Sequence, residues 1–313
     1  METIENIDAN KSIYVAGHNG MVGSAIIRAL NSRGQTNIIK RTSKELDLRD
    51  ASAVEDFFNS ERPQQVYLAA AKVGGILANK TYPATFLADN LAITSNIIKS
   101  AHKHQVEKLL FLGSSCIYPK HALQPIPEAA LLTGQLEPTN EAYAVAKIAG
   151  LKLCDAFRAQ YGCNFISAMP TNLYGPGDNY HPNDSHVLPA MIRRFHEAAR
   201  DGVSEVKCWG SGTPKREFLH VDDLAEACLF LMDNHNKGGW VNIGTGSDLS
   251  IQELAEMIAD IVNYKGKIFW DTSKPDGTHR KLLDTGLMKS LGWTASIGLK
   301  KGIKSVYHNY SPE

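Results

Sequence analysis

Ser12-Ile-Tyr-Val-Ala16-Gly17-His-Asn-Gly20-Met-Val-Gly23 places a short apolar run, a glycine-rich turn and the start of a helical pattern in one continuous stretch. The apolar run is typical of a buried parallel strand, and the glycines let the backbone turn tightly before a helix begins near Met21. A helix that starts there offers unpaired N–H groups and a partial positive charge to a phosphate. The spacing G-x-x-G-x-x-G is one residue longer than the common dinucleotide fingerprint. A glycine-rich turn without a ligand is the alternative, and the flanking strand and helix favour nucleotide binding.

Short apolar runs alternate with amphipathic helical patterns through the first half of the chain. Further strands are expected at residues 37–40, 65–69, 108–112 and 164–168, and helices at residues 21–33 and 51–60. Several of these runs are apolar throughout, as in a parallel sheet whose two faces are both covered. The alternation predicts an α/β fold with a doubly wound, Rossmann-like parallel sheet.

The sequence pattern changes after Pro170. Residues 172–184 are rich in Gly, Pro, Asn and Asp, which predicts a long functional loop. Helices and short strands are less regular beyond it, and we expect them to form a smaller α/β lobe at the carboxyl edge of the sheet. Residues 218–223, followed by an apolar helix, are expected to return to the first domain, so that the two lobes interleave in sequence.

The composition is that of a soluble globular protein. The chain has 313 residues, of which 43% are hydrophobic and 21% charged, with zero formal net charge. No basic block indicates nucleic acid, and no apolar run is long enough to span a bilayer. The segment from Met1 to Lys11 lacks the apolar core of a signal peptide. Five scattered cysteines favour reduced thiols in the cytoplasm, and no CxxC or HxxxH cluster predicts a metal site.

Tyr143 and Lys147 lie four residues apart in an expected helix, so both side chains can face the same cleft. An ammonium beside a phenol favours the phenolate, and we expect it to lower the pKa of Tyr143 from about 10. The tyrosine would then donate and accept a proton near neutral pH. Ser114, at the end of an apolar run, could hold a substrate oxygen. Because Y-x-x-x-K also occurs by chance in helices, the glycine-rich turn is the context that favours a reductase.

A basic turn follows the second predicted strand. In NAD enzymes an acidic residue near this position binds the ribose hydroxyls. This chain instead has Lys40-Arg41-Thr-Ser-Lys44, whose charges suit the additional 2′-phosphate of NADP. The alternative is a solvated charged turn, and the interpretation favours NADP.

Several motifs resemble those of one family. With the glycine-rich turn, Ser114, Tyr143 and Lys147 in place, the chain looks like an extended short-chain dehydrogenase/reductase. More closely, it resembles the GDP-L-fucose synthase family in Ala69-Ala-Ala-Lys-Val-Gly-Gly75, Leu112-Gly-Ser-Ser-Cys-Ile-Tyr-Pro119, Leu136-Glu-Pro-Thr-Asn-Glu-Ala-Tyr143, Met169-Pro-Thr-Asn-Leu-Tyr-Gly-Pro176, Trp209-Gly-Ser-Gly-Thr-Pro214 and Ser273-Lys-Pro-Asp-Gly-Thr278. The resemblance runs nearly from end to end.

The resemblance implies an NADP-dependent oxidoreductase that also acts as a 3,5-epimerase. The family converts GDP-4-keto-6-deoxy-D-mannose to GDP-L-fucose by epimerising C3 and C5 and then reducing C4 with NADPH. Residues 8–171 and roughly 216–243 are accordingly expected to form the NADP-binding domain. Residues of roughly 172–215 and 244–313 would form the GDP-sugar-binding lobe. The family often carries arginines where this chain has Asn19 and Ser43, and Arg41 and Lys44 are expected to compensate at the 2′-phosphate.

The resemblance also assigns residues. It makes Ser114, Tyr143 and Lys147 the reductase triad, and Cys116 and His186 the epimerase acid/base pair. The positions expected at the cofactor are Gly17, His18, Asn19, Gly20, Met21, Val22, Gly23, Arg41, Lys44, Leu112, Gly113, Lys147, Pro170, Thr171, Asn172, Leu173 and His186. The positions expected at the GDP-sugar are Arg194, Trp209, Arg216 and Asp276. Their ordinary alternatives are surface ion pairs for the arginines, a core position for the tryptophan and a turn-forming role for the aspartate.

The chemistry explains why such residues are needed together. Removing a proton from C3 or C5 gives an enolate whose charge lies on O4, and hydride delivery to C4 also puts charge on O4. Hydrogen bonds from Ser114 and Tyr143 to that oxygen would assist all three steps. Inversion further needs an acid and a base. Cys116, with an ordinary pKa of about 8.5, would be partly ionised near pH 7, and His186 would titrate at about 6.5.

The sequence leaves two alternative functions open and also predicts an oligomeric state. A nucleotide-sugar 4-epimerase or 4,6-dehydratase of the same superfamily would recycle tightly held NAD and consume no reductant. A non-catalytic dinucleotide-binding regulator would have no reason to keep all five catalytic residues. A homodimer is expected through the helices at about 83–104 and 141–160, because their apolar positions exceed one sheet-facing stripe. Those positions are Phe86, Ile93, Ile97, Ile148 and Leu151.

Overall fold

The computed structural model describes residues 10–182, 185–274 and 276–310. The polar segment before Asn10, the last two residues of the predicted 172–184 loop, Pro275 of the final quoted motif and the residues after Tyr310 lie outside this description. None of the helices in the described ranges combines the length and the apolar character needed to cross a bilayer.

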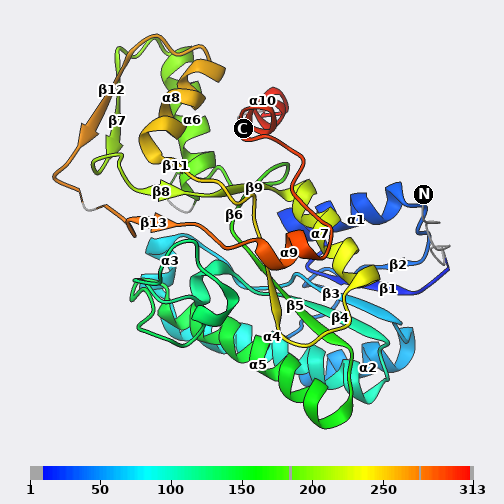
Figure 1. The fold of residues 1–313 in the computed structure, drawn as a ribbon. Helices are drawn as coiled ribbons and strands as arrows, with labels where there is room; N and C mark the ends of the chain where they lie inside the picture. Colours follow the sequence, from blue (N-terminus) through cyan, green and yellow to red (C-terminus); the bar gives the residue numbers. More distant parts are fainter. Residues whose placement is uncertain (1–9, 183–184, 275, 311–313) are drawn as a thin grey trace.

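Six parallel strands form the central sheet (Figure 1). In spatial order they are β10 (Trp240–Ile243), β5 (Phe165–Pro170), β4 (Lys108–Leu112), β3 (Gln65–Leu68), β1 (Ile13–Ala16) and β2 (Ile38–Ile39). Each of the five runs predicted as strands overlaps one of them, and β5 continues two residues beyond its predicted run. The chain moves from β1 outward to β2 and then to β3 on the opposite side of β1. The predicted doubly wound sheet is therefore confirmed, and its ligand-binding point is expected between β1 and β3.

Helices cover both faces of this sheet (Figure 1). α1 (Met21–Ser32) and α7 (Val221–Asn234) pack on one face, and α2 (Ala51–Glu61), α4 (Pro83–Lys103) and α5 (Glu141–Tyr161) pack on the other. The helices predicted at 21–33 and 51–60 match α1 and α2 to within one residue at each end. The Asp50 carboxylate accepts hydrogen bonds from the N–H groups of Ser52 (2.9 Å) and Ala53 (3.1 Å), a cap that stabilises α2 by about 1 kcal/mol.

The chain returns to the large sheet late in the sequence. β10 becomes its edge strand beside β5, and α7 lies against α1, where Arg33 forms ion pairs with Glu226 (2.7 Å) and Asp233 (2.9 Å). The buried Lys108 ammonium on β4 donates to the carbonyls of Leu231 (3.0 Å) and Met232 (2.6 Å) at the end of α7. A cation at a helix C-terminus satisfies carbonyls that the helix leaves unpaired, so Lys108 fastens α7 to the sheet.

The remaining elements form a smaller α/β part above the carboxyl edge of the sheet (Figure 1). Its helices are α6 (Val187–Arg200), α8 (Ile251–Ile261) and α10 (Leu299–His308), packed around one apolar cluster. Its strands pair as β7 (Glu205–Trp209) with β12 (Lys267–Asp271), and β8 (Lys215–Arg216) with both β11 (Leu249–Ser250) and β13 (Arg280–Lys281). A further pair, β6 (Asn172–Tyr174) and β9 (Phe218–His220), joins the two parts. Short helices complete the chain: α3 (Ile76–Thr81), η1 (Ser115–Ile117), η2 (Glu128–Ala130) and α9 (Gly286–Ser290). The assignment of cofactor and GDP-sugar to separate lobes stays a prediction.

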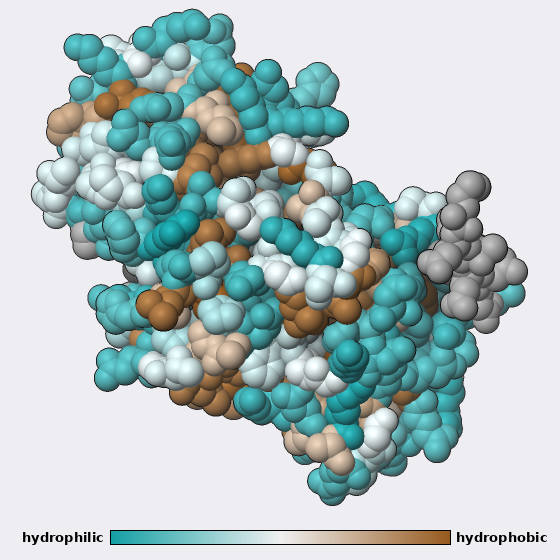
Figure 2. All heavy atoms as spheres, viewed as in Figure 1, coloured by the Kyte–Doolittle hydropathy of each residue, from teal (hydrophilic) through white to brown (hydrophobic). Residues whose placement is uncertain are grey.

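The apolar positions behind the homodimer prediction lie inside the subunit. Phe86, Ile97, Ile148 and Leu151 are buried, and Ile93 is partly buried, because α4 and α5 pack on each other as well as on the sheet. These positions are therefore used within the subunit, and the prediction that they are surplus and form a dimer interface is wrong. The large hydrophobic side chains that these two helices do expose are Leu91 (37%), Val145 (41%) and Tyr161 (51%) at the end of α5. On the face shown in Figure 2, hydrophobic residues (brown) form separate small groups among hydrophilic ones.

Candidate active site

The glycine-rich turn lies at the reversal point of the sheet. Gly17 has φ +84°, and a Cβ atom there would come within 2.7 Å of Ala70 at the end of β3. At Gly23 a Cβ atom would lie 2.2 Å from the Gly17 carbonyl oxygen. The Gly20 N–H closes the turn on that same oxygen at 3.0 Å. Only glycine fits the first and third positions, so this turn fixes the close approach of α1 to β1 and β3.

The beginning of α1 presents unpaired donors. Gly20 is its N-cap residue, and no side chain caps the first turn, which contains Met21 and Val22. The imidazole Nδ1 of His18 is buried and has no hydrogen-bond partner among the described residues. An uncapped helix N-terminus attracts a phosphate, and a buried polar atom without a partner is costly unless a ligand satisfies it. These observations fit a dinucleotide at the turn.

The predicted basic residues after β2 differ in their surroundings. Arg41 forms an ion pair with Glu61 (2.5 Å), and its guanidinium lies 5.7 Å from the centre of the Phe57 ring. Lys44 is exposed and has no ion-pair partner in the described part of the chain. Lys44 is therefore free to meet a phosphate, whereas Arg41 would have to share its charge with Glu61.

Lys147 connects the end of β4 with the predicted catalytic tyrosine. Its buried ammonium donates to the carbonyl oxygen of Leu112 at 2.7 Å. It lies 4.9 Å from the centre of the Phe111 ring and 5.7 Å from that of Tyr143. Tyr143, in the first turn of α5, is thus held beside the strand whose end precedes Ser114. Leu112 and Gly113, predicted at the cofactor, form this strand end, and a Cβ atom at Gly113 would collide with Met169.

The expected lowering of the tyrosine pKa is wrong. Burial raises the pKa of Tyr143 well above its ordinary value, and the nearby Cys116 raises it further. The physical reason is desolvation, which disfavours the phenolate more than a lysine can compensate for when that lysine is itself buried. Burial lowers the pKa of Lys147 to about 8. Tyr143 is therefore a neutral phenol at physiological pH, a state suited to donating a hydrogen bond or a proton.

Ser114 and Cys116 share one short turn. Ser114 caps the 3-10 helix η1, and its Oγ accepts a hydrogen bond from the Cys116 N–H at 3.3 Å. Cys116 is buried, with 6% of its surface exposed. Burial raises the pKa of its thiol, although Lys281, Ser114 and Lys147 act in the opposite direction. The expectation of a partly ionised thiol near pH 7 is therefore wrong, because the positive charges offset only part of the desolvation.

Lys281 is a charged neighbour of Cys116 that the sequence analysis did not single out. It lies on β13, directly opposite Arg216 on β8. Burial lowers the pKa of Lys281, while the charge of Cys116 acts to raise it. The main chain beside it is fixed, since Leu282 N–H donates to the Gln124 side chain at 2.8 Å. No local sequence pattern identifies Lys281, because its electrostatic interaction with Cys116 joins residues that are far apart in the sequence.

His186 lies at the start of α6, in the smaller part of the molecule, and its place in the site stays a prediction. It is the N-cap residue of α6 and follows the Gly/Pro-rich loop. His186 is exposed to solvent over part of its surface. The protein around its imidazole nevertheless removes enough water to lower the pKa of the ring. In the described residues no hydrogen bond joins His186 to Cys116. In the preceding loop, burial raises the pKa of Asp178 to about 6, and its Oδ2 has no hydrogen-bond partner in the described ranges.

The segment predicted beside the cofactor runs between the two parts. Pro170 ends β5, and Thr171 N–H donates to the Ile243 carbonyl on the neighbouring β10 at 3.0 Å. The Asn172 side chain donates to the Glu217 carbonyl at 2.8 Å. Leu173 pairs with Leu219 across β6 and β9. These contacts lead the chain out from the carboxyl edge of the sheet, next to β4 and its Ser114 turn.

The four predicted GDP-sugar residues lie on the smaller part and its strands. Trp209 is 68% exposed, so the alternative of a core tryptophan is wrong. Arg194 and Arg216 donate to the carbonyls of Lys207 (3.0 Å) and Lys215 (2.7 Å). The Asp276 carboxylate accepts hydrogen bonds from the N–H (2.8 Å) and the hydroxyl (2.7 Å) of Ser211. Asp276 therefore supports the turn after Trp209, and this contact engages both of its carboxylate oxygens.

Comparisons with known proteins agree with this geometry. A model of the NAD dependent epimerase/dehydratase family matches residues 13–244. GDP-L-fucose synthase 1 of Arabidopsis thaliana is 58% identical over 97% of this chain and 94% of the relative. GDP-L-fucose synthase of Escherichia coli (strain K12) is 56% identical over 96% of both. A solved GDP-mannoheptose C4 reductase from Campylobacter jejuni with NADP bound is 38% identical, covers 96% of this chain and 98% of that one, and has a TM-score of 0.90. A GDP-L-fucose synthetase from Naegleria fowleri bound to NADP is 29% identical, with 95% and 93% covered and a TM-score of 0.87.

Proposed function

Because this chain belongs to the NAD dependent epimerase/dehydratase family and, within it, to the GDP-L-fucose synthases, we propose how its own residues divide the catalytic work. The enzyme converts GDP-4-keto-6-deoxy-D-mannose to GDP-L-fucose by 3,5-epimerisation and NADPH-dependent reduction of the C4 ketone. It thereby serves nucleotide-sugar biosynthesis.

One hydrogen-bonding site is proposed to serve all three steps. Ser114 and Tyr143 donate to O4 of the sugar, where negative charge develops in both enolates and during reduction. The neutral phenol of Tyr143 supports this role, since a phenolate could not donate. Lys147, held by the Leu112 carbonyl at 2.7 Å, adds a positive charge close to the same oxygen. Tyr143 then gives its proton to O4 once C4 has been reduced.

Cys116 and His186 are proposed as the acid and base that invert C3 and C5. Cys116 lies two residues after Ser114 in the same turn, so a sugar held by its O4 has its neighbouring carbons near the thiol. The Lys281 and Lys147 charges favour the thiolate against the burial that opposes it. His186 is supplied from the α6 side of the site.

NADPH supplies the hydride when bound. The glycine-rich turn and the first turn of α1 would hold its pyrophosphate, as the close approaches of Gly17 and Gly23 and the partnerless Nδ1 of His18 indicate. Lys44 and Arg41 are proposed to meet the 2′-phosphate in place of the arginines that the family often carries. The strand ends at Gly113 and Pro170 would line the nicotinamide side.

The substrate's nucleotide is proposed to lie on the smaller part of the protein. Arg194 and Arg216 would bind the diphosphate, since a guanidinium matches phosphate oxygens bidentately. The exposed Trp209 ring would cover the base, and Asp276 would position the turn beside it. We further propose a homodimer through α4 and α5, supported by the exposed Leu91, Val145 and Tyr161, and a cytoplasmic location, supported by five unpaired cysteines.

One incubation tests the proposed function. Purified enzyme receives GDP-4-keto-6-deoxy-D-mannose with NADPH or with NADH, and NMR determines the product's configuration at C3, C4 and C5. We expect GDP-L-fucose, formed with one NADPH consumed per sugar. A product with unchanged C3 and C5, or turnover without NADPH consumption as in a 4-epimerase or 4,6-dehydratase, would contradict the assignment. Binding of NADPH without any turnover would instead support a non-catalytic regulator.

A further inference from the structure

A cavity of about 410 Å³ lies beside the predicted catalytic tyrosine. Its wall is formed by the loop that follows β3, by α3, by the beginning of α4 and by Asn179 of the 172–184 loop. The hydrophobic side chains in this wall are those of Val73, Ala78, Tyr82 and Phe86. The Phe86 ring also meets the Tyr143 ring edge-on, with 6.4 Å between centroids and 81° between planes. One aromatic side chain therefore separates the cavity from the phenol that would protonate O4.

The cavity and the segment that follows Cys116 lie towards opposite edges of the sheet. β3, whose loop lines the cavity, borders β4 on the side of β1. Residues after Cys116 instead approach the other edge of the sheet, where the Tyr118 hydroxyl donates to Asn242 on β10. The cavity can therefore receive a substituent of the sugar that points away from Cys116.

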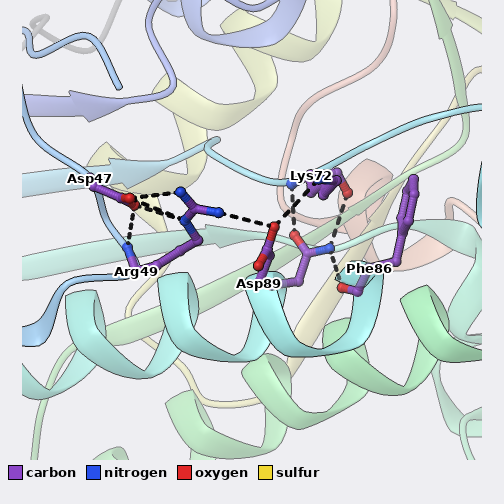
Figure 3. Close-up of polar contacts among 6 residues, drawn as sticks. Asp47, Arg49, Lys72, Phe86 and Asp89 are labelled. Atoms are coloured by element: carbon purple, nitrogen blue, oxygen red, sulfur yellow. Dashed lines mark hydrogen bonds and ion pairs between the residues drawn. The ribbon is translucent and has the colours of Figure 1, made fainter. Parts of the chain in front are cut away.

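The buried side-chain amide of Asn90 fixes the wall of the cavity. Figure 3 draws this amide without a label, with its hydrogen bonds to Lys72 and Phe86. Asn90 on α4 accepts the Lys72 N–H at 2.9 Å and donates to the Lys72 carbonyl at 3.0 Å and the Phe86 carbonyl at 2.7 Å. The Lys72 ammonium lies 3.5 Å from the Asp89 carboxylate, which also contacts Arg49. The backbone of the loop is thus fixed on α4, and the Lys72 ammonium is paired with a carboxylate that it shares with Arg49.

The cavity exposes hydrophobic surface. Val73 is 66% exposed and Tyr82 is 59% exposed, and both line the cavity, whose Phe86 contacts Tyr143. A Cβ atom on Gly74 would come within 3.0 Å of the Phe86 ring, so the small residue keeps this space open. Exposed apolar side chains around a concave site indicate an apolar group in the ligand.

We propose that this cavity receives the C6 methyl group of the keto sugar, and that Val73 and Tyr82 select 6-deoxy sugars over sugars that retain the C6 hydroxyl. The inference rests on the proposed function. In this proposal Ser114 and Tyr143 hold O4. C6 is two bonds from the carbonyl carbon C4, whereas C1, which carries the diphosphate, lies across the ring from C4. The cavity is much larger than a methyl group, which leaves room for C6 before and after C5 inverts.

The test compares two exposed valines. Val73→Thr places a hydroxyl where the methyl group would lie, while Val203→Thr makes the same change at a 45% exposed position in the turn before β7. For Val73→Thr we expect kcat/KM for GDP-4-keto-6-deoxy-D-mannose to fall about tenfold, with the Kd for NADPH unchanged. The ratio of kcat/KM for GDP-4-keto-6-deoxy-D-mannose to kcat/KM for GDP-4-keto-D-mannose, which keeps the C6 hydroxyl, should be smaller in Val73→Thr than in the wild type. Val203→Thr should match the wild type in every measurement.

Each result decides the matter. If Val73→Thr keeps the wild-type kcat/KM and selectivity in an enzyme that turns over, the inference is overturned and the proposed function stands. If the variant loses NADPH affinity while its selectivity at C6 is unchanged, the cavity belongs to the cofactor and the inference is again overturned. If the wild-type enzyme fails to turn over, the proposed function and this inference fall together.

Discussion

Lys147 shows how burial redirects the roles that local sequence suggests. The four-residue spacing correctly indicated that its side chain and that of Tyr143 lie together, 5.7 Å apart from ammonium to ring centre. It did not reveal that the ammonium is buried on the Leu112 carbonyl, or that burial makes the phenol a weaker acid. The spacing of Tyr143 and Lys147 is a property of the local sequence. The desolvation of their side chains depends instead on all the residues that pack around them in the fold.

The charge of Lys147 gives a pH prediction. Its pKa is lowered to about 8, so kcat for reduction should fall as pH rises through about 8 and the ammonium is lost. The unfolded state keeps this proton up to about pH 10.4. Between these values the unfolded chain binds more protons, and the contribution of Lys147 to the free energy of unfolding should rise with pH. A pH profile of kcat beside denaturant melts at each pH measures both trends.

Lys147→Arg is the matched variant, because a guanidinium stays charged throughout this range. Its kcat should be lower overall, since the side chain differs in shape, but the decline near pH 8 should vanish. An unchanged decline in the arginine variant would assign that titration to another group, such as Cys116.

At the scale of single elements, the continuously apolar or periodic stretches were predictable, whereas the two-residue strands of the smaller part were not. The runs behind β1, β3 and β4 are continuously apolar, and α1 and α2 follow helical periodicity, so both their type and their limits could be predicted. β8, β11 and β13 contain two residues each, too few to carry a period. Lys281 belongs to one of them, and it was missed for this reason.

The loop after β3 depends on Asn90 of α4. Asn90→Ala removes three hydrogen bonds from a residue that is 2% exposed, and leaves two carbonyls and one N–H to find other partners. We expect the free energy of unfolding to fall by about 1–3 kcal/mol and KM for the GDP-sugar to rise several-fold. Urea denaturation and steady-state kinetics measure the two effects.

Asn96→Ala provides the control on the same helix, because Asn96 makes one hydrogen bond, to the Leu48 carbonyl at 3.0 Å, away from the cavity. It should lose stability without a change in KM. Equal KM values in the two variants would show that Asn90 stabilises α4 without shaping the site.

At the scale of the whole molecule, one buried glutamate, through its side chain and its main-chain carbonyl, joins segments from four places in the chain. Glu217 accepts hydrogen bonds from the N–H groups of Gly246 (2.7 Å) and Leu283 (3.1 Å), and its carbonyl accepts from Asn172 (2.8 Å). Its surface is 0% exposed. The sequence indicated that the chain crosses between its two parts, but nothing local identified the residue on which the crossings converge.

Glu217→Gln should therefore weaken the junction. An amide turns N–H donors toward a pocket that already holds backbone donors, which predicts a loss of about 1–3 kcal/mol in the free energy of unfolding. Because the carboxylate holds Leu283, two residues after the Lys281 whose charge acts on Cys116, kcat/KM should fall as well. Thermal and urea unfolding measure the first effect, and wild-type stability in this variant would exclude Glu217 as the junction.

We propose that one oxyanion site serves both epimerisation and reduction, and that Cys116 is needed only for epimerisation. The most direct measurement is NMR of solvent deuterium incorporated at C3 and C5 of GDP-4-keto-6-deoxy-D-mannose, in Tyr143→Phe and Cys116→Ser beside the wild type. We predict that Tyr143→Phe loses reduction yet still exchanges deuterium, whereas Cys116→Ser folds and binds NADPH but exchanges at least tenfold more slowly. Wild-type exchange in Cys116→Ser, or near wild-type reduction in Tyr143→Phe, would contradict it.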